Sequence, residues 1–273
     1  MSEADAIAAS ERPATAATLV ADLRALGVEP GMTLMVHSAL SRLGFVAGGA
    51  HTVVLALLEA VGPIGTLMMP THSTHLSEPS EWSNPPVPES WFQPLRDEMP
   101  AYDPALTPTR SMGAIVECFR HVPGVMRSAH PCVSAAAVGP DAEILVSEHA
   151  LAHALGEGSP QARLYDLDGH VLLLGVDHGN NTSLHLSEYR SPPPGGHEVV
   201  QYASAIVDDG ERRWVTYDSI EEDEEDFPQL GEAFAETGLE RRGPVGAGVG
   251  RLMRSRDIVS FGVEWLRVNR HGG

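Results

Sequence analysis

The stretch GMTLMVHSALSRLGFVAGGAHTVVLALLEAVGPIGTLMMPTHS (residues 31–73) decides the class of fold. Residues 31–40 predict a strand that runs into a polar His-Ser pair, and residues 48–63 predict a helix that a Gly-Pro pair stops. Residues 65–73 predict a second short strand, which ends in Thr-His-Ser. Because a further helix precedes this stretch, the order α-β-α-β predicts helices packed against a sheet that is at least partly parallel.

The rest of the chain continues the pattern of alternating helices and strands. Residues 15–27 place Leu19, Leu23 and Leu26 on one helical face that ends at Gly27. Further predicted helices lie at 112–124, 141–156 and 159–167, and further predicted strands at 130–140, at 170–176 and within 195–216, around a turn at Asp208-Asp209-Gly210. The glycine-rich run at 243–250 is predicted to be a tight turn that opens a helix. The chain then closes with a helix followed by a strand or a second helix.

The domain organisation follows from a change of composition in the first half of the chain. Residues 1–14 are predicted to be a flexible lead-in, and residues 15–273 to form a single domain. Within it, residues 74–109 are rich in Pro, Ser and Glu and contain Trp82 and Trp91. That composition predicts a long ordered excursion, or lid-like insertion.

Composition restricts the partners of the protein. The net charge is −19, and every basic side chain is Arg, because the sequence contains no Lys. Such a surface repels nucleic acid and anionic membranes and attracts polycations. No apolar run is long enough to cross a bilayer, and the N-terminus lacks the pattern of a secretory signal. Two cysteines, Cys118 and Cys132, do not make a disulfide framework, so we expect a reduced, cytoplasmic protein.

Polar residues after the strands indicate where a site lies. The polar ends of the predicted strands, at residues 37–38, 71–73 and from 177 onward, should converge on one cleft, because sites in α/β sheets gather beyond the carboxyl ends of strands. After the last of these strands, His185 is followed one helical turn later by Glu188. This pair is typical of a general base with a supporting acid, of two metal ligands, or of a solvated helix start.

The acid–base hypothesis is the strongest of the three, because a His near a buried strand can have a pKa close to the working pH. A carboxylate on its other nitrogen would fix the tautomer, and the candidates are Glu188, Asp218 and Glu221. The acidic run at 218–226 is usually a solvated segment. Beside a cleft it would also bind several ammonium groups.

Metal and nucleophile signals are weaker. Thirteen histidines include His149 and His153 at helical spacing, but H-E-x-x-H and paired C-x-x-C are absent. No metal is expected, although a metal-dependent hydrolase using His185, Glu188 and another His stays an alternative. No G-x-S-x-G occurs, and both cysteines are expected to be inert packing residues.

At this point the chain resembles a known family, the aminoglycoside 3-N-acetyltransferases. The similar stretches are residues 34–73, 102–140, 154–190 and 241–262, which cover most of residues 16–262. The specific motifs are RSAHP followed by AVGP, and LLLGVDHGNNTSLHLSE. The likeness is to the branch that acts on apramycin-, gentamicin- and tobramycin-type drugs. The resemblance implies the family's own α/β fold, a central mixed sheet flanked by helices, which is not GCN5-related.

The resemblance also implies a reaction and the residues that perform it. The reaction is acetylation of the 3-amino group of a 2-deoxystreptamine aminoglycoside by acetyl-CoA, which confers antibiotic resistance. His185 corresponds to the family's catalytic base, and its acid would be Asp218 or Glu221. Ser219 stands where the family has another carboxylate. The acetyl-CoA cradle corresponds to His37, Ser38, Ala39, Leu40, Arg110, Ser111, Met112 and Gly113.

A polycationic drug suits this acidic chain, and Glu188, Asp218, Glu221 and Glu222 are the candidate residues of the substrate wall. We expect direct transfer without a nucleophilic Cys or Ser, in a monomer or homodimer. The alternatives are an acetyltransferase of another small amine and a binder that only sequesters the drug. Acetyl-CoA is the expected cosubstrate, with an anion site supported by Ser38 and Arg42 at the strand-to-helix turn.

Overall fold

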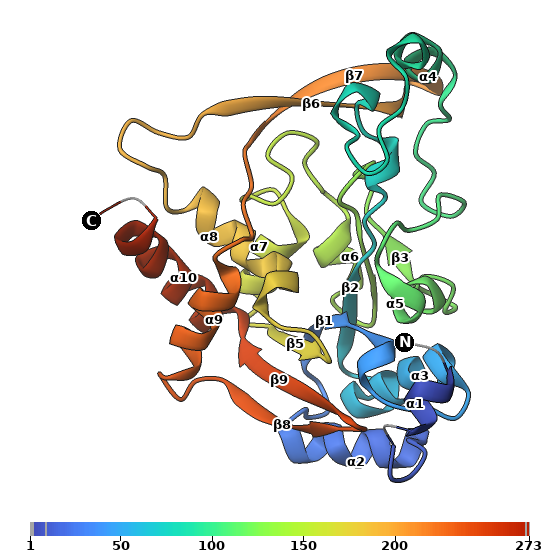
Figure 1. Cartoon of the computed structure of the whole chain (residues 1–273), viewed down its shortest axis with the longest axis vertical. Coiled ribbons are helices and arrows are strands. Elements are labelled where there is room, and N and C mark those ends of the chain that lie inside the picture. Colours follow the sequence, from blue (N-terminus) through green and yellow to red (C-terminus); the bar gives the residue numbers. More distant parts are fainter. Residues whose placement is uncertain (1–2, 9, 271, 273) are drawn as a thin grey trace.

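A seven-stranded mixed sheet forms the centre of the molecule in the computed structural model, which describes residues 3–8, 10–270 and 272 (Figure 1). From one edge to the other, the strands are β3 (Met126–Arg127), β4 (Ala135–Val138), β2 (Thr66–Pro70), β1 (Thr33–Ser38), β5 (His170–Leu174), β9 (Gly248–Arg254) and β8 (Arg241–Val245). The central strand β1 is parallel to β2 and to β5, whereas β4 and β9 are antiparallel to their inner neighbours. The α/β class and the mixed sheet predicted above are therefore confirmed.

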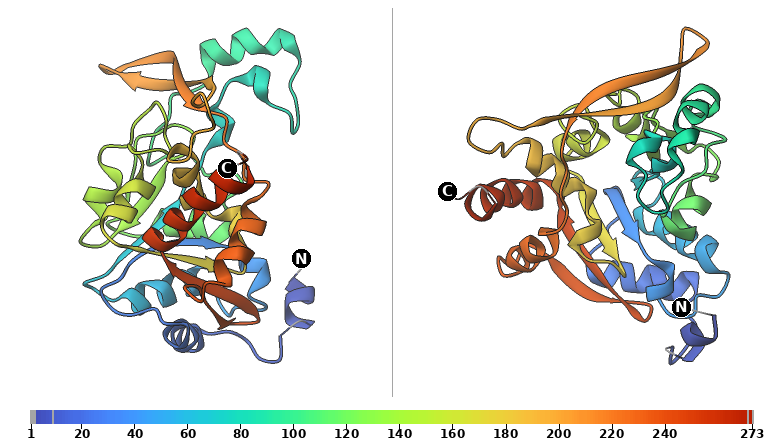
Figure 2. Two further views of the ribbon diagram at one scale, coloured as in Figure 1. Left: turned by 90° about the vertical axis from the view of Figure 1, so that its left-hand side faces the viewer. Right: turned by 45° about the horizontal axis from the view of Figure 1, so that its top comes forward.

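Each sheet face packs on its own set of helices, as the two views of Figure 2 show for α2 and α10. One face carries α2 (Ala16–Leu26), α3 (Gly49–Val61) and α5 (Gly113–Phe119). The other carries α6 (Ala142–Val146), α7 (Pro160–Asp166), α8 (His185–Tyr189), α9 (Phe227–Ala235) and α10 (Ser255–Asn269). Along β1, Leu34 and Val36 enter the first core and Met35 enters the second. Because side chains alternate along a strand, a continuous apolar run such as β1 can fill both cores.

The helix ends follow the capping residues in the sequence. Thr15 caps α2 by accepting a hydrogen bond from the backbone N–H of Thr18, and Gly27 closes the helix with φ of 110°. Ser159 caps α7 by accepting from the N–H of Ala162, and Pro160 follows it at the first helical position. These two helices begin where the sequence predicts them.

A second, two-stranded sheet lies apart from the central one. Strands β6 (Val199–Asp208) and β7 (Glu211–Ile220) form a hairpin that turns at Asp209-Gly210, and the figure shows it at the top of the molecule beside α4 (Phe92–Glu98) (Figure 1). The predicted turn is confirmed, although β7 extends to Ile220, beyond the predicted range of 195–216.

The insertion at 74–109 packs against this hairpin. It contains three short 3₁₀ turns and α4, and its Leu76, Met99 and Tyr102 form a small apolar cluster. The N–H of Tyr102 donates to the carbonyl of Ala205 at 3.2 Å, and Arg212 Nε donates to the carbonyl of Met99 at 2.7 Å. The insertion therefore packs against another element of the chain.

Two local predictions differ from the structure. The helix predicted at 141–156 ends at Val146, and residues 147–158 form turns, because tertiary hydrogen bonds hold the His149 ring on Ser128 and on the carbonyl of Ala154. The glycine-rich run at 243–250 does contain a tight turn, at Gly246 with φ of 58°, but the turn joins strands β8 and β9 and opens no helix. Within the predicted lead-in, Glu3–Ala8 form helix α1. Residues 1, 2 and 9 lie outside the described part of the chain.

No helix in the described part of the chain combines the length and the apolar character that a membrane span requires.

Candidate active site

The carboxyl ends of three parallel strands meet around one cavity. Strand β1 ends at His37 and Ser38, β2 leads to His72, and β5 leads through two 3₁₀ turns to His185 at the start of α8. All four residues line a cavity of about 260 Å³, together with Asn181, Thr182, Glu224 and Phe227. The expectation that the strand ends converge on one cleft is confirmed.

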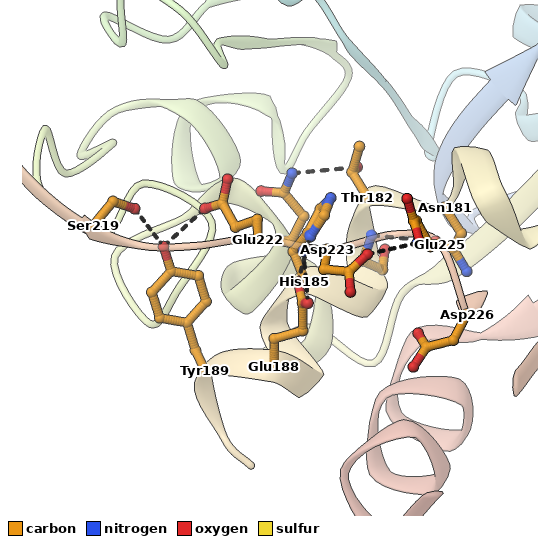
Figure 3. Close-up of polar contacts among 12 residues, drawn as sticks. Asn181, Thr182, His185, Glu188, Tyr189, Ser219, Glu222, Asp223, Glu225 and Asp226 are labelled. Carbon is orange, nitrogen blue, oxygen red and sulfur yellow. Dashed lines mark hydrogen bonds and ion pairs between the residues drawn. The ribbon is translucent and has the colours of Figure 1, made fainter. Parts of the chain in front are cut away.

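His185 and Glu188 form a hydrogen-bonded pair inside α8. The ring Nδ1 lies 2.6 Å from Glu188 Oε2, and the two residues are three apart on the helix (Figure 3). The other oxygen, Glu188 Oε1, accepts from the backbone N–H of Asp223 at 3.0 Å and from Arg270 Nη1 at 2.5 Å. With Glu188 on Nδ1, the remaining nitrogen of the ring, Nε2, is the one available to exchange a proton with a substrate.

The charges around His185 favour its protonated form. Burial is the largest single effect and lowers the pKa of the ring, but the bond to Glu188 and the charges of Glu188, Glu222 and Glu224 outweigh it. The net result is a pKa raised above the ordinary value of 6.5. An imidazolium is therefore stabilised at this position.

The carboxylate that contacts His185 is neither of the two that the resemblance implies, Asp218 and Glu221. Asp218 lies exposed on β7, where its carboxylate accepts from Gln201 Nε2 at 3.3 Å across the hairpin. Glu221 is exposed at the start of the segment after β7. Glu188 instead contacts His185, because the three-residue spacing within one helix brings their side chains together.

Glu222 is held beside this pair by a tyrosine. The Tyr189 hydroxyl donates to Glu222 Oε1 at 2.9 Å, and Ser219 Oγ lies 2.9 Å from the same hydroxyl (Figure 3). Burial raises the pKa of the Glu222 carboxyl, and the charges of Glu188 and Glu224 add to that shift. A nearby cation would relieve this repulsion, so the carboxyl is suited to bind an ammonium group.

An acidic pocket of about 660 Å³ adjoins the cavity. Its acidic lining residues are Glu188, Glu198, Glu221, Glu222, Asp223, Glu224 and Glu225. Glu224 lines the pocket and the cavity, so the two spaces share a wall. Of the predicted substrate-wall residues, Glu221 and Glu222 line this pocket, as does Glu188, whereas Asp218 does not.

A groove of about 850 Å³ adjoins the cavity through other shared residues. Six of the eight predicted cradle residues line it: Ser38, Ala39, Leu40, Ser111, Met112 and Gly113. His37 lines the inner cavity instead, and Arg110 is exposed, while its backbone N–H donates to the carbonyl of His72 at 2.8 Å. Arg42 is also exposed and is not among the residues that line the groove.

Sequence reasoning missed several lining residues of the groove. Gly44, Gly48 and Gly49 line it, and each has a positive φ, between 61° and 83°. The sequence GFVAGG at 44–49 is the signal that could have found them, because clustered glycines let a backbone approach a ligand closely. Ala6 of α1 lines the same groove, so the predicted lead-in contributes to it.

Two further histidines of the cavity are neutral. Burial lowers the pKa of His37 and of His72 to about 3, and neighbouring histidines add to the effect. Of these three rings, only His185 has a raised pKa, so it is the one that takes up a proton most readily.

The metal and nucleophile alternatives gain no support from the geometry. Among residues 3–8, 10–270 and 272, no three His, Cys, Asp or Glu side chains are grouped as metal ligands, so His185 and Glu188 have no third ligand. The Cys132 thiol is buried, and burial raises its pKa, which disfavours the reactive thiolate.

Comparison with known proteins identifies relatives along the whole chain. A family model described as aminoglycoside 3-N-acetyltransferase matches residues 35–267. The SPbeta prophage-derived aminoglycoside N(3')-acetyltransferase-like protein YokD of Bacillus subtilis is 42% identical over 93% of each chain. Aminoglycoside N(3)-acetyltransferase VII of Streptomyces paromomycinus is 37% identical over 97% of this chain and 96% of the relative.

Solved structures show the same likeness. The crystal structure of YokD from Bacillus subtilis superposes with a TM-score of 0.96, 40% identity and 99% coverage of both chains. AAC-IIIb in a binary complex with CoASH gives 0.85 and 32% identity, over 96% of this chain and 98% of the other. AAC-VIa bound to sisomicin gives 0.85 and 34% identity, over 96% of this chain and all of the other.

Proposed function

Since the chain belongs to the aminoglycoside 3-N-acetyltransferase family, we propose that it transfers an acetyl group directly from acetyl-CoA to the 3-amino group of a 2-deoxystreptamine aminoglycoside. In this proposal His185 is the general base, and Glu188 is the carboxylate that supports it. The observation that carries this proposal is the position of the pair. Its cavity shares Ser38, Ser111 and Met112 with the groove, and Glu224 with the acidic pocket.

The groove is the proposed site of acetyl-CoA. A relative of the same fold is known in complex with CoASH. Positive φ at Gly44, Gly48, Ser111 and Gly113 gives the groove a backbone that would suit close approach of an anion, and the apolar Leu40 and Met112 also line it. The thioester would then enter the cavity from the groove.

The acidic pocket is the proposed site of the drug. Several carboxylates attract a molecule with several ammonium groups, and a relative of the same fold is known with sisomicin bound. We propose apramycin-, gentamicin- and tobramycin-type drugs as acceptors, with resistance as the consequence. The insertion at 74–109 and the acidic segment are the proposed determinants of drug choice. Another small amine stays a second candidate, because the relative YokD is named only as acetyltransferase-like.

The proposed chemistry uses the raised basicity of His185. The uncharged amine attacks the thioester carbon and forms the new C–N bond, while His185 Nε2 takes the proton that the nitrogen releases. Glu188 stabilises the imidazolium through Nδ1. The tetrahedral intermediate collapses, the C–S bond breaks, and the imidazolium returns its proton to the departing CoA thiolate. No acyl-enzyme is needed.

The experiment measures thiol release from acetyl-CoA across a panel of aminoglycosides and small amines, with mass spectrometry of the product. We expect acetylated drug from the wild type. His185→Ala should lower kcat by about 10²–10⁴-fold and leave the KM for acetyl-CoA unchanged. An unchanged kcat in His185→Ala would show that His185 is not the general base. Turnover of small amines without turnover of any aminoglycoside would show that the substrate is another small amine. Drug binding without thiol release would mean sequestration.

We also propose that the enzyme works in the cytoplasm, where acetyl-CoA is made, as a monomer or homodimer and without a metal. Both cysteines are unpaired, which suits a reducing compartment. Light scattering on the purified protein measures the oligomeric state.

A further inference from the structure

Arg270, the residue that follows α10, contacts the carboxylate of the catalytic pair. Its Nη1 donates to Glu188 Oε1 at 2.5 Å, and its Nη2 donates to the backbone carbonyl of Asp223 at 2.6 Å. The same guanidinium forms an ion pair with Asp226, in which Nε lies 2.9 Å from Oδ2. The side chain is 20% exposed, so this is a largely enclosed contact.

These contacts close a ring between three parts of the chain. The N–H of Asp223 donates to the same Glu188 oxygen that Arg270 binds. Phe227, next in sequence to Asp226, has its ring 5.9 Å below the guanidinium carbon and 5.1 Å from the His185 ring. Arg270 therefore links the end of α10, the acidic segment and the catalytic pair through direct contacts.

The positive charge of Arg270 lies on the carboxylate that binds His185. Burial disfavours the guanidinium charge, but the bonds to Asp226 and Glu188 outweigh it and raise the pKa of Arg270. The groups that face His185 are the carboxylates of Glu188, Glu222 and Glu224 and the neutral rings of His37 and His72. Arg270 offsets part of that negative charge from behind Glu188.

We propose that Arg270 is a positioning residue of the acetyl transfer, which fixes Glu188 through Oε1 so that Oε2 stays on His185 and the acidic segment stays against the pair. This inference rests on the proposed role of His185. The family model matches residues 35–267, so Arg270 lies beyond the matched region.

The test compares Arg270→Gln, Arg270→Lys and a matched control, Arg267→Gln. Arg267 lies in the last turn of α10, pairs with Glu264, and is 51% exposed. The readouts are kcat and the pH profile of kcat/KM with one drug, so that the ionisation of the drug amine is the same for every variant.

Arg270→Gln should lower kcat by about 10–100-fold, because a small displacement of Glu188 and His185 from the reactive geometry slows the reaction by about that factor. The acidic midpoint of kcat/KM should rise by about one pH unit, since the unshielded Glu188 keeps the proton on His185 to higher pH. Arg270→Lys keeps the positive charge but loses the planar guanidinium with its several N–H donors. It should therefore keep the wild-type midpoint of the pH profile but only part of the wild-type kcat. Arg267→Gln should match the wild type.

Wild-type kcat and midpoint in Arg270→Gln would overturn the inference, and so would a loss of kcat that follows the melting temperature while the midpoint stays. If Arg270→Gln fails to fold, Arg270→Lys decides: a wild-type kcat overturns the inference and a reduced one supports it. Failure of the proposed function looks different, because His185→Ala would then keep its activity. If His185→Ala is inactive while Arg270→Gln behaves as Arg267→Gln, only the inference fails.

Discussion

Glu188→Gln tests the catalytic pair most directly, because the amide is nearly isosteric with the carboxylate but removes its charge and one of its two acceptor oxygens. Glu188 is 4% exposed and its oxygens have three partners, so the substituted side chain should keep its place. A hydrogen bond to a charged group contributes about 1.5–3 kcal/mol. If this whole free energy stabilises the transition state, kcat should fall by roughly 10–150-fold in the variant, since 1.4 kcal/mol is a factor of ten.

The pH profile gives the sign of the effect. The bond to Glu188 and its charge raise the pKa of His185, so their loss should move the acidic limb of kcat to lower pH. At low pH the variant would therefore lose less activity than at pH 8. The assay is steady-state thiol release between pH 5.5 and 9 at saturating acetyl-CoA and drug.

The control is Asp218→Asn, an exposed carboxylate thirty residues later whose bond is to Gln201. It should retain wild-type kcat at every pH. The reasoning is refuted if Asp218→Asn loses activity and Glu188→Gln does not, since the acid from the hairpin would then be the partner after all.

Two further predictions concern charge. The KM for the drug should rise several-fold between 25 and 300 mM salt in the thiol-release assay, because both partners carry several charges, whereas a flat dependence would exclude the acidic pocket as the drug site. Stability should fall as the pH drops from about 6.5 towards 3, because His37, His72 and His130 have a pKa of about 3 when folded and bind protons more readily when unfolded. Each should cost about 1 kcal/mol at pH 5.5; His185, with its raised pKa, opposes them, since its stabilisation is present below 6.5 and lost as the pH rises through its folded pKa. Urea unfolding at pH 7.5 and 5.5 measures the difference, and equal stabilities would contradict it.

The sequence predicts the sheet and the position of His185 because both depend on local signals. The continuous apolar run of β1 and the polar residues at its end are visible in a few residues. The pair His185–Glu188 is visible too, because the two residues are one helical turn apart. The resemblance to the family pointed instead to Asp218 or Glu221, which lie about thirty residues later. The local geometry decides the contact.

Predictions failed where contacts distant in the sequence override local preference. The apolar pattern of 141–156 continues past Val146, but the chain leaves the helix and His149 binds Ser128 on another segment. Likewise Arg270 has no motif of its own. Its role depends on an acidic segment more than forty residues earlier, and only the folded chain reveals it.

The separation of the groove from the acidic pocket has a consequence for how this enzyme can change. The groove, which is the proposed donor side, is lined mainly by residues 38–49 and 111–114, and the acidic pocket, which is the proposed acceptor side, by residues 188–198 and 220–225. Both share lining residues with the small cavity at His185. Apart from Glu188, which also holds His185, selection for new drugs can therefore change residues of the acidic pocket while the acetyl donor and the transfer chemistry are inherited unchanged.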